Sequence, residues 1–195
     1  MTELDARGLS CPHPVLETKK VLAGIQEGTV TVIVDNPESK ENVYRFALYE
    51  GCRVEVDEKG RDFHLHITKR PGDEAKAGEA KAAVPSVVCI TTDRVGVGSE
   101  ELGAILMKAF LNTLWDYEPS PEKLILINNG VFLATEGSAV LDALSLLENK
   151  GVEILSCGTC LAFYDLKDKL KVGRISNMHE IVAAMMTSGR VINIS

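Results

Sequence analysis

The sequence predicts an α/β protein in which a small βαβαββ two-layer sandwich precedes a mostly parallel α/β three-layer domain. β-Branched strands dominate the first part, and continuous apolar runs separated by strongly periodic helices fill the second. A break in composition divides them: residues 71–84 are small and charged, with no large apolar residue until Val84. We therefore expect a domain at 1–70, a flexible linker at 71–84 and a domain at 85–195.

The first domain is expected to run strand, helix, strand, helix, strand, strand. Pro12 can open a helix, Gly28 ends the helical pattern, and the β-branched run after Gly28 favours a strand. Asn36-Pro37 is a typical helix start, and Glu58-Lys59-Gly60-Arg61 is a hairpin signature. The expected helices span 12–23 and 36–51, and the expected strands after the opening one span 29–34, 53–56 and 63–68.

The second domain alternates buried strands with long helices. Its strands are predicted at 87–91, 124–127, 152–155 and 190–194, and its helices carry periodic apolar residues over 102–113, 140–147 and 181–186. Asn177 and Glu180 have the spacing of a capping box at the start of the last helix. This alternation predicts parallel strands joined by right-handed crossovers.

The composition of the chain argues against several classes of function. The chain carries 28 acidic and 21 basic residues, a net charge of −7, so a nucleic-acid partner is not expected. No apolar run approaches the ~18 residues of a membrane helix, and the start Met-Thr-Glu-Leu-Asp lacks the pattern of a signal peptide. Five cysteines in such a chain favour free thiols over a disulfide framework. We therefore expect a cytoplasmic protein without a membrane partner.

The run from Leu4 to Pro14 places a cysteine directly before the predicted start of a helix. Prolines at 12 and 14 are tolerated in a first helical turn, whose N–H groups lack intrahelical partners. With Cys11 as N-cap, its sulfur would face the positive end of the helix, which predicts an unusually acidic, reactive thiol. The alternative is that Cys11 is a small buried apolar residue. The flanking prolines favour the reactive thiol.

A second cysteine motif lies where an α/β sheet places its ligands, beyond the carboxyl ends of the strands. Those ends are predicted at Thr92-Asp93-Arg94, at Asn128-Asn129-Gly130 and at residues 156–160. The last segment contains Cys157 and Cys160 as a Cys-x-x-Cys pair, between a strand and the helix that follows. This location makes the pair a candidate site.

Three interpretations of the pair compete. Structural zinc needs four ligands, and only His179 lies nearby. A thioredoxin-type dithiol suits Cys-Gly-Thr-Cys after a strand, but that fold sets a cis-proline against its thiols and no proline follows Pro121. The third interpretation is sulfur handling, with one cysteine accepting a sulfane sulfur and the other resolving it.

The remaining cysteines and histidines are weaker candidates. Cys52 and Cys89 lie in strand-like segments, and we interpret them as core residues. His64 and His66 alternate along one strand, which predicts a shared, exposed or half-exposed face. His13 is either a partner that holds Cys11 as thiolate or simply a polar first-turn residue.

Two known families match these motifs. Residues 4–70, with Leu-Asp-x-x-Gly-x-x-Cys-Pro-x-Pro, resemble the TusA/SirA family of small sulfur carriers. Residues 85–195 resemble the DsrE-like sulfur-relay fold, in which the strand at 151–157 leads to the acceptor cysteine. Together the halves are similar to the YedF-like group of sulfurtransferase-like selenium metabolism proteins.

The resemblance implies a sulfurtransferase-like carrier that relays sulfane sulfur or selenium as a cysteine persulfide or perselenide. Cys11 would carry the cargo in the first domain, and Cys157 would accept it in the second, with Cys160 placed to release it. The implied partners are a cysteine desulfurase or other sulfur or selenium donor and an acceptor protein; no cofactor or metal is implied. DsrE-like domains are commonly trimeric or hexameric, which allows a homo-oligomer through the second domain.

Two other function classes stay open at this point. One is a dithiol redox protein that uses Cys157 and Cys160, and the other is a regulatory binding module in which no cysteine turns over. The three classes differ in the mass change that a sulfur donor produces on the chain.

Overall fold

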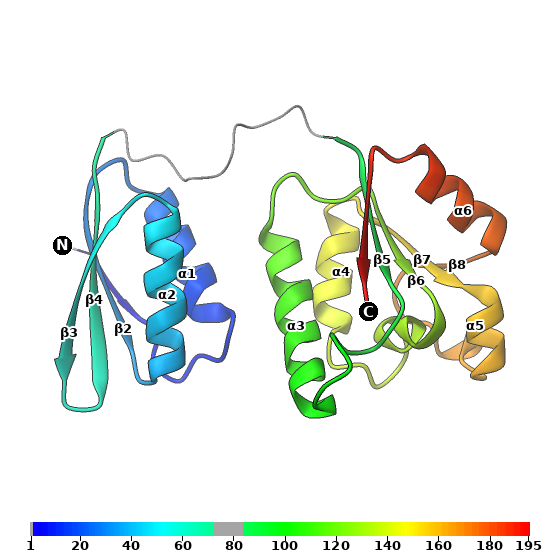
Figure 1. The fold of residues 1–195 in the computed structure, drawn as a ribbon, viewed down its shortest axis with the longest axis horizontal. Helices are drawn as coiled ribbons and strands as arrows, with labels where there is room; N and C mark the ends of the chain where they lie inside the picture. Colours follow the sequence, from blue (N-terminus) through cyan, green and yellow to red (C-terminus); the bar gives the residue numbers. More distant parts are fainter. Residues whose placement is uncertain (1, 72–83) are drawn as a thin grey trace. The chain divides into compact units, whose positions relative to one another are not determined.

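The structure is a computed structural model that describes residues 2–71 and 84–195. The chain divides into two compact units between residues 81 and 82 (Figure 1). The first unit and the second unit each have their own sheet and their own apolar core. Positions 72–83 of the predicted linker lie outside the described residues.

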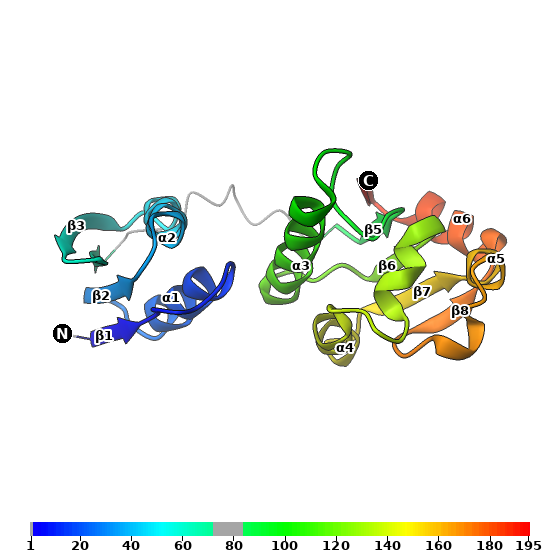
Figure 2. The same ribbon diagram turned by 90° about the horizontal axis from the view of Figure 1, so that it is seen from below.

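The first unit is a four-stranded sheet with two helices packed against it (Figure 2). Its elements are β1 (Thr2–Asp5), α1 (His13–Ala23), β2 (Gly28–Val34), α2 (Pro37–Tyr49), β3 (Arg53–Lys59) and β4 (Asp62–Lys69). The strand order is β1-β2-β4-β3; β1 and β2 are parallel, and the other pairs are antiparallel. The predicted βαβαββ order is confirmed.

The core of this unit forms because alternate residues of the central strands are apolar and face the helices. These residues are buried together with apolar residues of α1 and α2. The fully buried members are Val30, Val32, Val34, Val43, Ala47, Leu65 and Ile67. On α2, the Asn36 side chain caps the helix by accepting from the Ser39 N–H at 2.8 Å.

The second unit contains a five-stranded parallel sheet with strand order β8-β7-β6-β5-β9. Its strands are β5 (Ser86–Ile90), β6 (Lys123–Leu126), β7 (Glu153–Cys157), β8 (Arg174–Ser176) and β9 (Arg190–Ile194). Its helices are α3 (Glu100–Asp116), α4 (Leu141–Asn149), α5 (Gly158–Phe163) and α6 (Met178–Thr187), with 3₁₀ segments η1 (Asn128–Ala134) and η2 (Lys167–Lys169).

Helices cover both faces of this sheet (Figures 1 and 2). One core joins α3, α4 and η1 to one face of the strands. A smaller core joins α6 to the other face and includes Cys89 and Cys157. The predicted mostly parallel three-layer α/β domain is therefore confirmed, and within it the sheet is wholly parallel.

The structure adds short elements that the sequence pattern did not reveal. Strand β8 has three residues, two of them exposed, and α5 has six, so neither gives a periodic apolar signal.

Asn177 caps α6 as predicted, because its side chain accepts from the Glu180 N–H at 3.0 Å. The Glu180 carboxylate bonds Ser176 and Arg174. Among the described residues, no helix is both long and apolar enough to cross a membrane.

Candidate functional site

Cys11 lies in the turn between β1 and α1, one residue before the helix cap. The first helical hydrogen bond runs from the Leu16 N–H to the Pro12 carbonyl at 3.2 Å, so Pro12 is the N-cap. The prediction that Cys11 is the N-cap is wrong, because Ser10 accepts a bond from the His13 N–H and closes a separate turn around the cysteine. The Cys11 sulfur therefore does not occupy the capping position.

The motif around Cys11 is fixed by side chains from neighbouring strands. Gly8 has a φ of +72°, which favours glycine, and its N–H donates to Asp35 Oδ2 at 2.8 Å. Arg7 bonds Asp5 at 2.7 Å and Asp62 at 2.9 Å. The Arg7 guanidinium lowers the pKa of Asp5 to about 2. These contacts explain the aspartate and glycine of the motif: they hold the turn that presents the thiol.

Cys11 is exposed, yet its sulfur is partly shielded by the two prolines and by α2. It lines a shallow hollow with Pro12, Pro14, Val15, Ser39 and Asn42. The Asn42 amide lies 3.9 Å from the sulfur and donates toward it. The polar groups that α2 contributes to this hollow are the side chains of Ser39 and Asn42.

The predicted acidity of Cys11 is wrong. Burial raises the pKa of the Cys11 thiol, and the Glu38 carboxylate raises the pKa further. The Nδ1 atom of His13 lies 3.2 Å from the Ser10 carbonyl oxygen. The sequence did not identify Glu38 and Asn42 as neighbours of Cys11, although their i, i+4 spacing on α2 puts them on one helix face.

In the second unit, the carboxyl ends of β6 and β7 meet as predicted. The Asn128 N–H, directly after β6, donates to Cys160 Sγ at 3.2 Å. The Tyr164 hydroxyl lies 3.0 Å from Asn128 Oδ1 and 2.5 Å from Asn129 Oδ1. Tyr164 is a further polar residue of this site, and its position one turn after Cys160 was the available signal.

The two cysteines of the pair differ in access. Cys157 ends β7 and is only 1% exposed, within the core on the α6 side of the sheet. Cys160 is half-buried and lies within hydrogen-bonding reach of Cys157. Burial raises the pKa of Cys160 and the Cys157 thiol raises the pKa further, whereas the Asn128 N–H lowers it. The pair thus has an outer thiol, Cys160, and an inner thiol, Cys157.

The other candidate residues are Cys52, Cys89, His64 and His66. Cys52 and Cys89 are buried at 4% and 1%, which confirms them as core residues. His64 and His66 are half-buried on β4, and His66 contacts Thr31 and Asp57. Within residues 2–71 and 84–195, no group of three His, Cys, Asp or Glu side chains is arranged to hold a metal ion.

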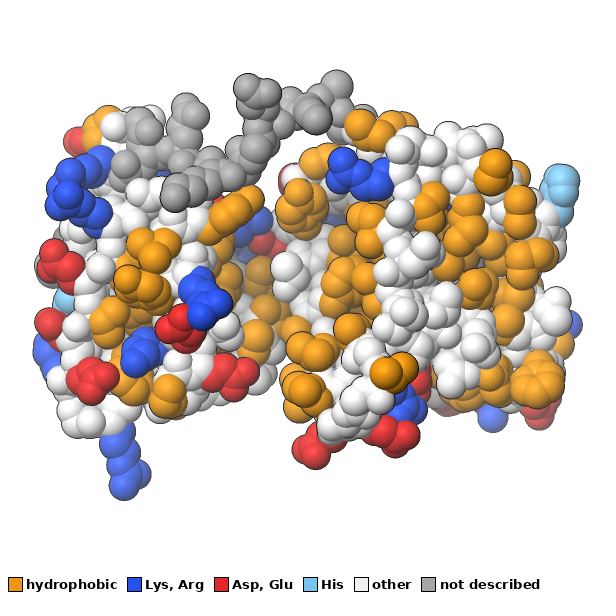
Figure 3. All heavy atoms as spheres, viewed as in Figure 1, with side chains coloured by type: hydrophobic (Ala, Val, Ile, Leu, Met, Phe, Trp, Pro, Cys, Tyr) orange, Lys and Arg blue, Asp and Glu red, His pale blue; other side chains and the backbone are white. Residues whose placement is uncertain are grey.

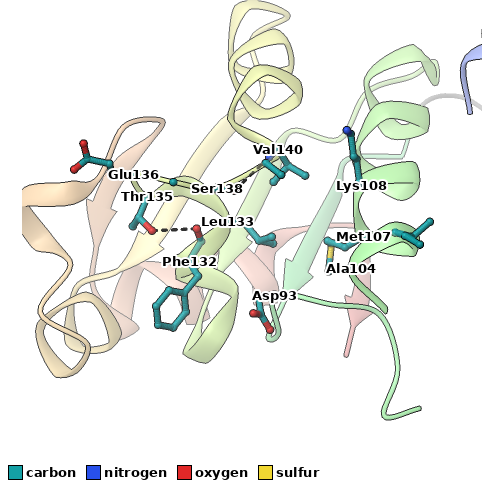
Figure 4. Close-up of a pocket in the computed structure, with 13 residues that line it drawn as sticks. Asp93, Ala104, Met107, Lys108, Phe132, Leu133, Thr135, Glu136, Ser138 and Val140 are labelled. Carbon is teal, nitrogen blue, oxygen red and sulfur yellow. Dashed lines mark hydrogen bonds between the residues drawn. The ribbon is translucent and has the colours of Figure 1, made fainter. Parts of the chain in front are cut away.

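A cavity of about 490 Å³ opens between α3 and the segment that follows η1 (Figure 4). Asp93 contributes one polar side chain, and Phe132, Met107 and Val140 contribute apolar surface. None of its lining residues is a cysteine. Asp93, from the strand end predicted at Thr92-Asp93-Arg94, therefore lines this cavity. Arg94 pairs with Asp93 at 3.0 Å and with Glu100 at 2.7 Å.

The first unit is thus a two-layer α/β domain that presents one exposed thiol on a fixed turn. Residues 2–69 match the family described as Sulfurtransferase TusA. They are 42% identical over 69 residues to the sulfur carrier protein TusA of Allochromatium vinosum, a match covering 34% of this chain and 91% of that protein. By this first unit, the chain belongs to the TusA family.

Two solved structures are also similar. A SirA-like protein from Desulfitobacterium hafniense is 38% identical with a TM-score of 0.34, covering 35% of this chain and 96% of that one. The ychN protein from E. coli is 16% identical with a TM-score of 0.45, covering 56% of this chain and 99% of that one.

Proposed function

We propose that this protein carries sulfane sulfur as a persulfide on Cys11. The observation that carries the proposal is the exposed Cys11 thiol, held on a fixed turn in a domain of the TusA family. The family relative from Allochromatium vinosum is named as a sulfur carrier protein. No cofactor is needed for this chemistry, since thiol and persulfide exchange sulfur directly.

Loading is a redox-neutral exchange between sulfur atoms. The Cys11 thiolate attacks the outer sulfur of a donor persulfide, a new Cys11 S–S bond forms, and the donor's S–S bond breaks to release the donor thiolate. A cysteine desulfurase is the class of donor that presents such a persulfide. Asn42 lies where its amide can donate to the anionic terminal sulfur.

We further propose that the second unit is DsrE-like and that Cys157 and Cys160 take over the cargo. The pair lies at the carboxyl edge of a parallel sheet, where one thiol is accessible and the other lies directly behind it. A TusA-like unit followed by a DsrE-like unit is the organisation of the YedF-like group, so selenium is a second candidate cargo. The same exchange step would move selenium from a perselenide.

A homo-oligomer through the second unit is part of this proposal. Exposed apolar side chains gather on this unit over α6 and β9, and β9 is an edge strand (Figure 3). The large exposed apolar residues on these two elements are Met178, Val182, Met186, Val191 and Ile192. An unpaired edge with such a surface favours association with a second copy.

Intact-mass spectrometry tests the function. The full chain is incubated with a cysteine desulfurase and cysteine, and in a parallel sample with the same donor system plus selenide, which would attack the inner sulfur of a Cys11 persulfide and expel hydrosulfide. We expect the mass of the chain to increase by that of one or more sulfur atoms. The addition at the first unit should be lost in Cys11→Ser. It should be retained in Cys52→Ala, which replaces a buried cysteine of the same unit. A loss of two hydrogens alone would identify a dithiol redox protein, and an unchanged mass would identify a binding module.

A further inference from the structure

The accessible thiol of the second unit is held by the end of the neighbouring strand. Cys160 Sγ accepts the Asn128 N–H at 3.2 Å, and Asn128 is a non-glycine residue with a φ of +51°. This left-handed conformation is uncommon outside glycine, although asparagine tolerates it best. It aims a backbone N–H away from the sheet edge and at the sulfur.

The Tyr164 hydroxyl holds this conformation in place. Its single proton is shared between Asn128 Oδ1 at 3.0 Å and Asn129 Oδ1 at 2.5 Å. The tyrosine ring is itself packed between two aromatic rings, with centroids 4.9 Å from Phe132 and 5.1 Å from Phe163. Because Tyr164 and Cys160 belong to the same turn of the chain, the hydrogen bonds of the Tyr164 hydroxyl position the Asn128 N–H relative to the Cys160 thiol.

We propose that Cys160 is the thiol at which the second unit takes up sulfane sulfur, with the Asn128 N–H stabilising its anion and Tyr164 as the positioning residue. This inference rests on the proposed function. It reverses the order expected from the sequence, in which Cys157 accepts first, because Cys157 is 1% exposed and Cys160 shields it. A protein-bound persulfide reaches the outer thiol before the inner one.

The chemistry of uptake and release balances with the two thiols present. Cys160 thiolate attacks the outer sulfur of the incoming persulfide, forms a new S–S bond and releases the donor thiolate. Cys157 then attacks Cys160 Sγ, which forms the Cys157–Cys160 disulfide and releases hydrosulfide, so the sulfane sulfur is reduced while the two thiols are oxidised. A dithiol reductant is the co-reactant that restores the pair.

The first test measures how fast Cys160 of the reduced full-length chain is alkylated as a function of pH, peptide by peptide. Tyr164→Phe removes only the hydroxyl and should slow Cys160 alkylation at neutral pH about three- to tenfold, with a midpoint at higher pH. Tyr117→Phe, an exposed tyrosine after α3, is the matched control and should change nothing. Cys11 is an internal reference whose rate should be equal in all three chains.

The second test loads the chain with glutathione persulfide and locates the added sulfur by mass spectrometry. Cys157→Ser should still gain sulfur at Cys160, and Cys160→Ser should gain none in the second unit. Sulfur on Cys157 in Cys160→Ser, loading of Cys11 alone in Cys157→Ser, where release as hydrosulfide is blocked, or an unchanged alkylation profile in Tyr164→Phe would each overturn the inference. Loading of Cys160 without Cys11 would instead overturn the proposed function and leave this inference standing.

Discussion

At the scale of single residues, the surroundings of Cys11 suit storage of sulfur better than fast attack. Burial and the Glu38 carboxylate raise the pKa of the Cys11 thiol, which makes Cys11 a poorer leaving group in sulfur exchange. If Cys11 carries a persulfide, as proposed, we expect that persulfide to be lost slowly to other thiols. The Asn42 amide, 3.9 Å from the sulfur, is the polar contact that a docked partner would find already in place.

The pH dependence of Cys11 alkylation follows from the same contacts. The midpoint should lie above the ordinary cysteine value of about 8.5, because a nearby negative charge and burial both disfavour thiolate. Glu38→Gln removes the charge and should lower the midpoint. Glu41→Gln is the control on the same helix, since Glu41 pairs with Arg45 at 2.6 Å and should leave the midpoint unchanged. Equal midpoints in all three chains would refute the role of Glu38.

The sequence could predict which residues matter here but not their geometry. The Cys-Pro-x-Pro pattern identifies Cys11 as a candidate, yet the Ser10–His13 turn moves the cap to Pro12, and no local pattern shows this. Glu38, Asn128 and Tyr164 act through contacts between distant segments. Spacing can place Tyr164 one turn after Cys160, but which groups these side chains contact depends on how the elements pack.

At the scale of elements, β7 carries both the second candidate site and an unusual buried hydroxyl. Ser156 is 0% exposed, and within the described residues its hydroxyl has no hydrogen-bond partner. Burying an unpaired hydroxyl costs stability. Ser176 at the end of β8, by contrast, is buried at 5% exposure and donates to Glu180 at 2.5 Å. The two serines form a matched pair on neighbouring strands.

Replacing each of these serines by alanine should change the free energy of unfolding differently. Ser156→Ala should leave the free energy of unfolding unchanged or raise it by up to about 1 kcal/mol, because no bond is lost. Ser176→Ala should lower it by about 1 kcal/mol, since a hydrogen bond to a carboxylate disappears. Urea unfolding of the full chain, followed by circular dichroism, measures both. A clear loss of stability in Ser156→Ala would mean that its hydroxyl is bonded after all.

Element prediction succeeded where the apolar pattern was long. The buried strands β5, β6 and β7 and helices α3 and α6 follow from continuous or periodic apolar residues. Strand β8 and helix α5 were missed because three and six residues are too few for a period. Since α5 carries Cys160, the sequence located the second site but not the access to it.

At the scale of the whole molecule, two units with separate cores are joined in one chain. The composition of residues 71–84 predicts a tether, which would keep Cys11 and the second-unit thiols at an effective concentration on the order of millimolar. Transfer from Cys11 should then proceed at the same rate over a wide range of protein dilution. A rate proportional to protein concentration would show instead that the units serve separate partners.

The central claim is that sulfur enters at Cys11 and passes to the thiol pair of the second unit. It is tested by loading the full chain with sulfur-35 from a cysteine desulfurase, removing the donor, and following the label by peptide over time. We expect label first on the Cys11 peptide and then, in Cys157→Ser, where release as hydrosulfide is blocked, on the peptide that contains Cys160. Neither peptide should be labelled in Cys11→Ser. Label that never reaches Cys11, or that reaches the second unit equally fast in Cys11→Ser, would contradict it.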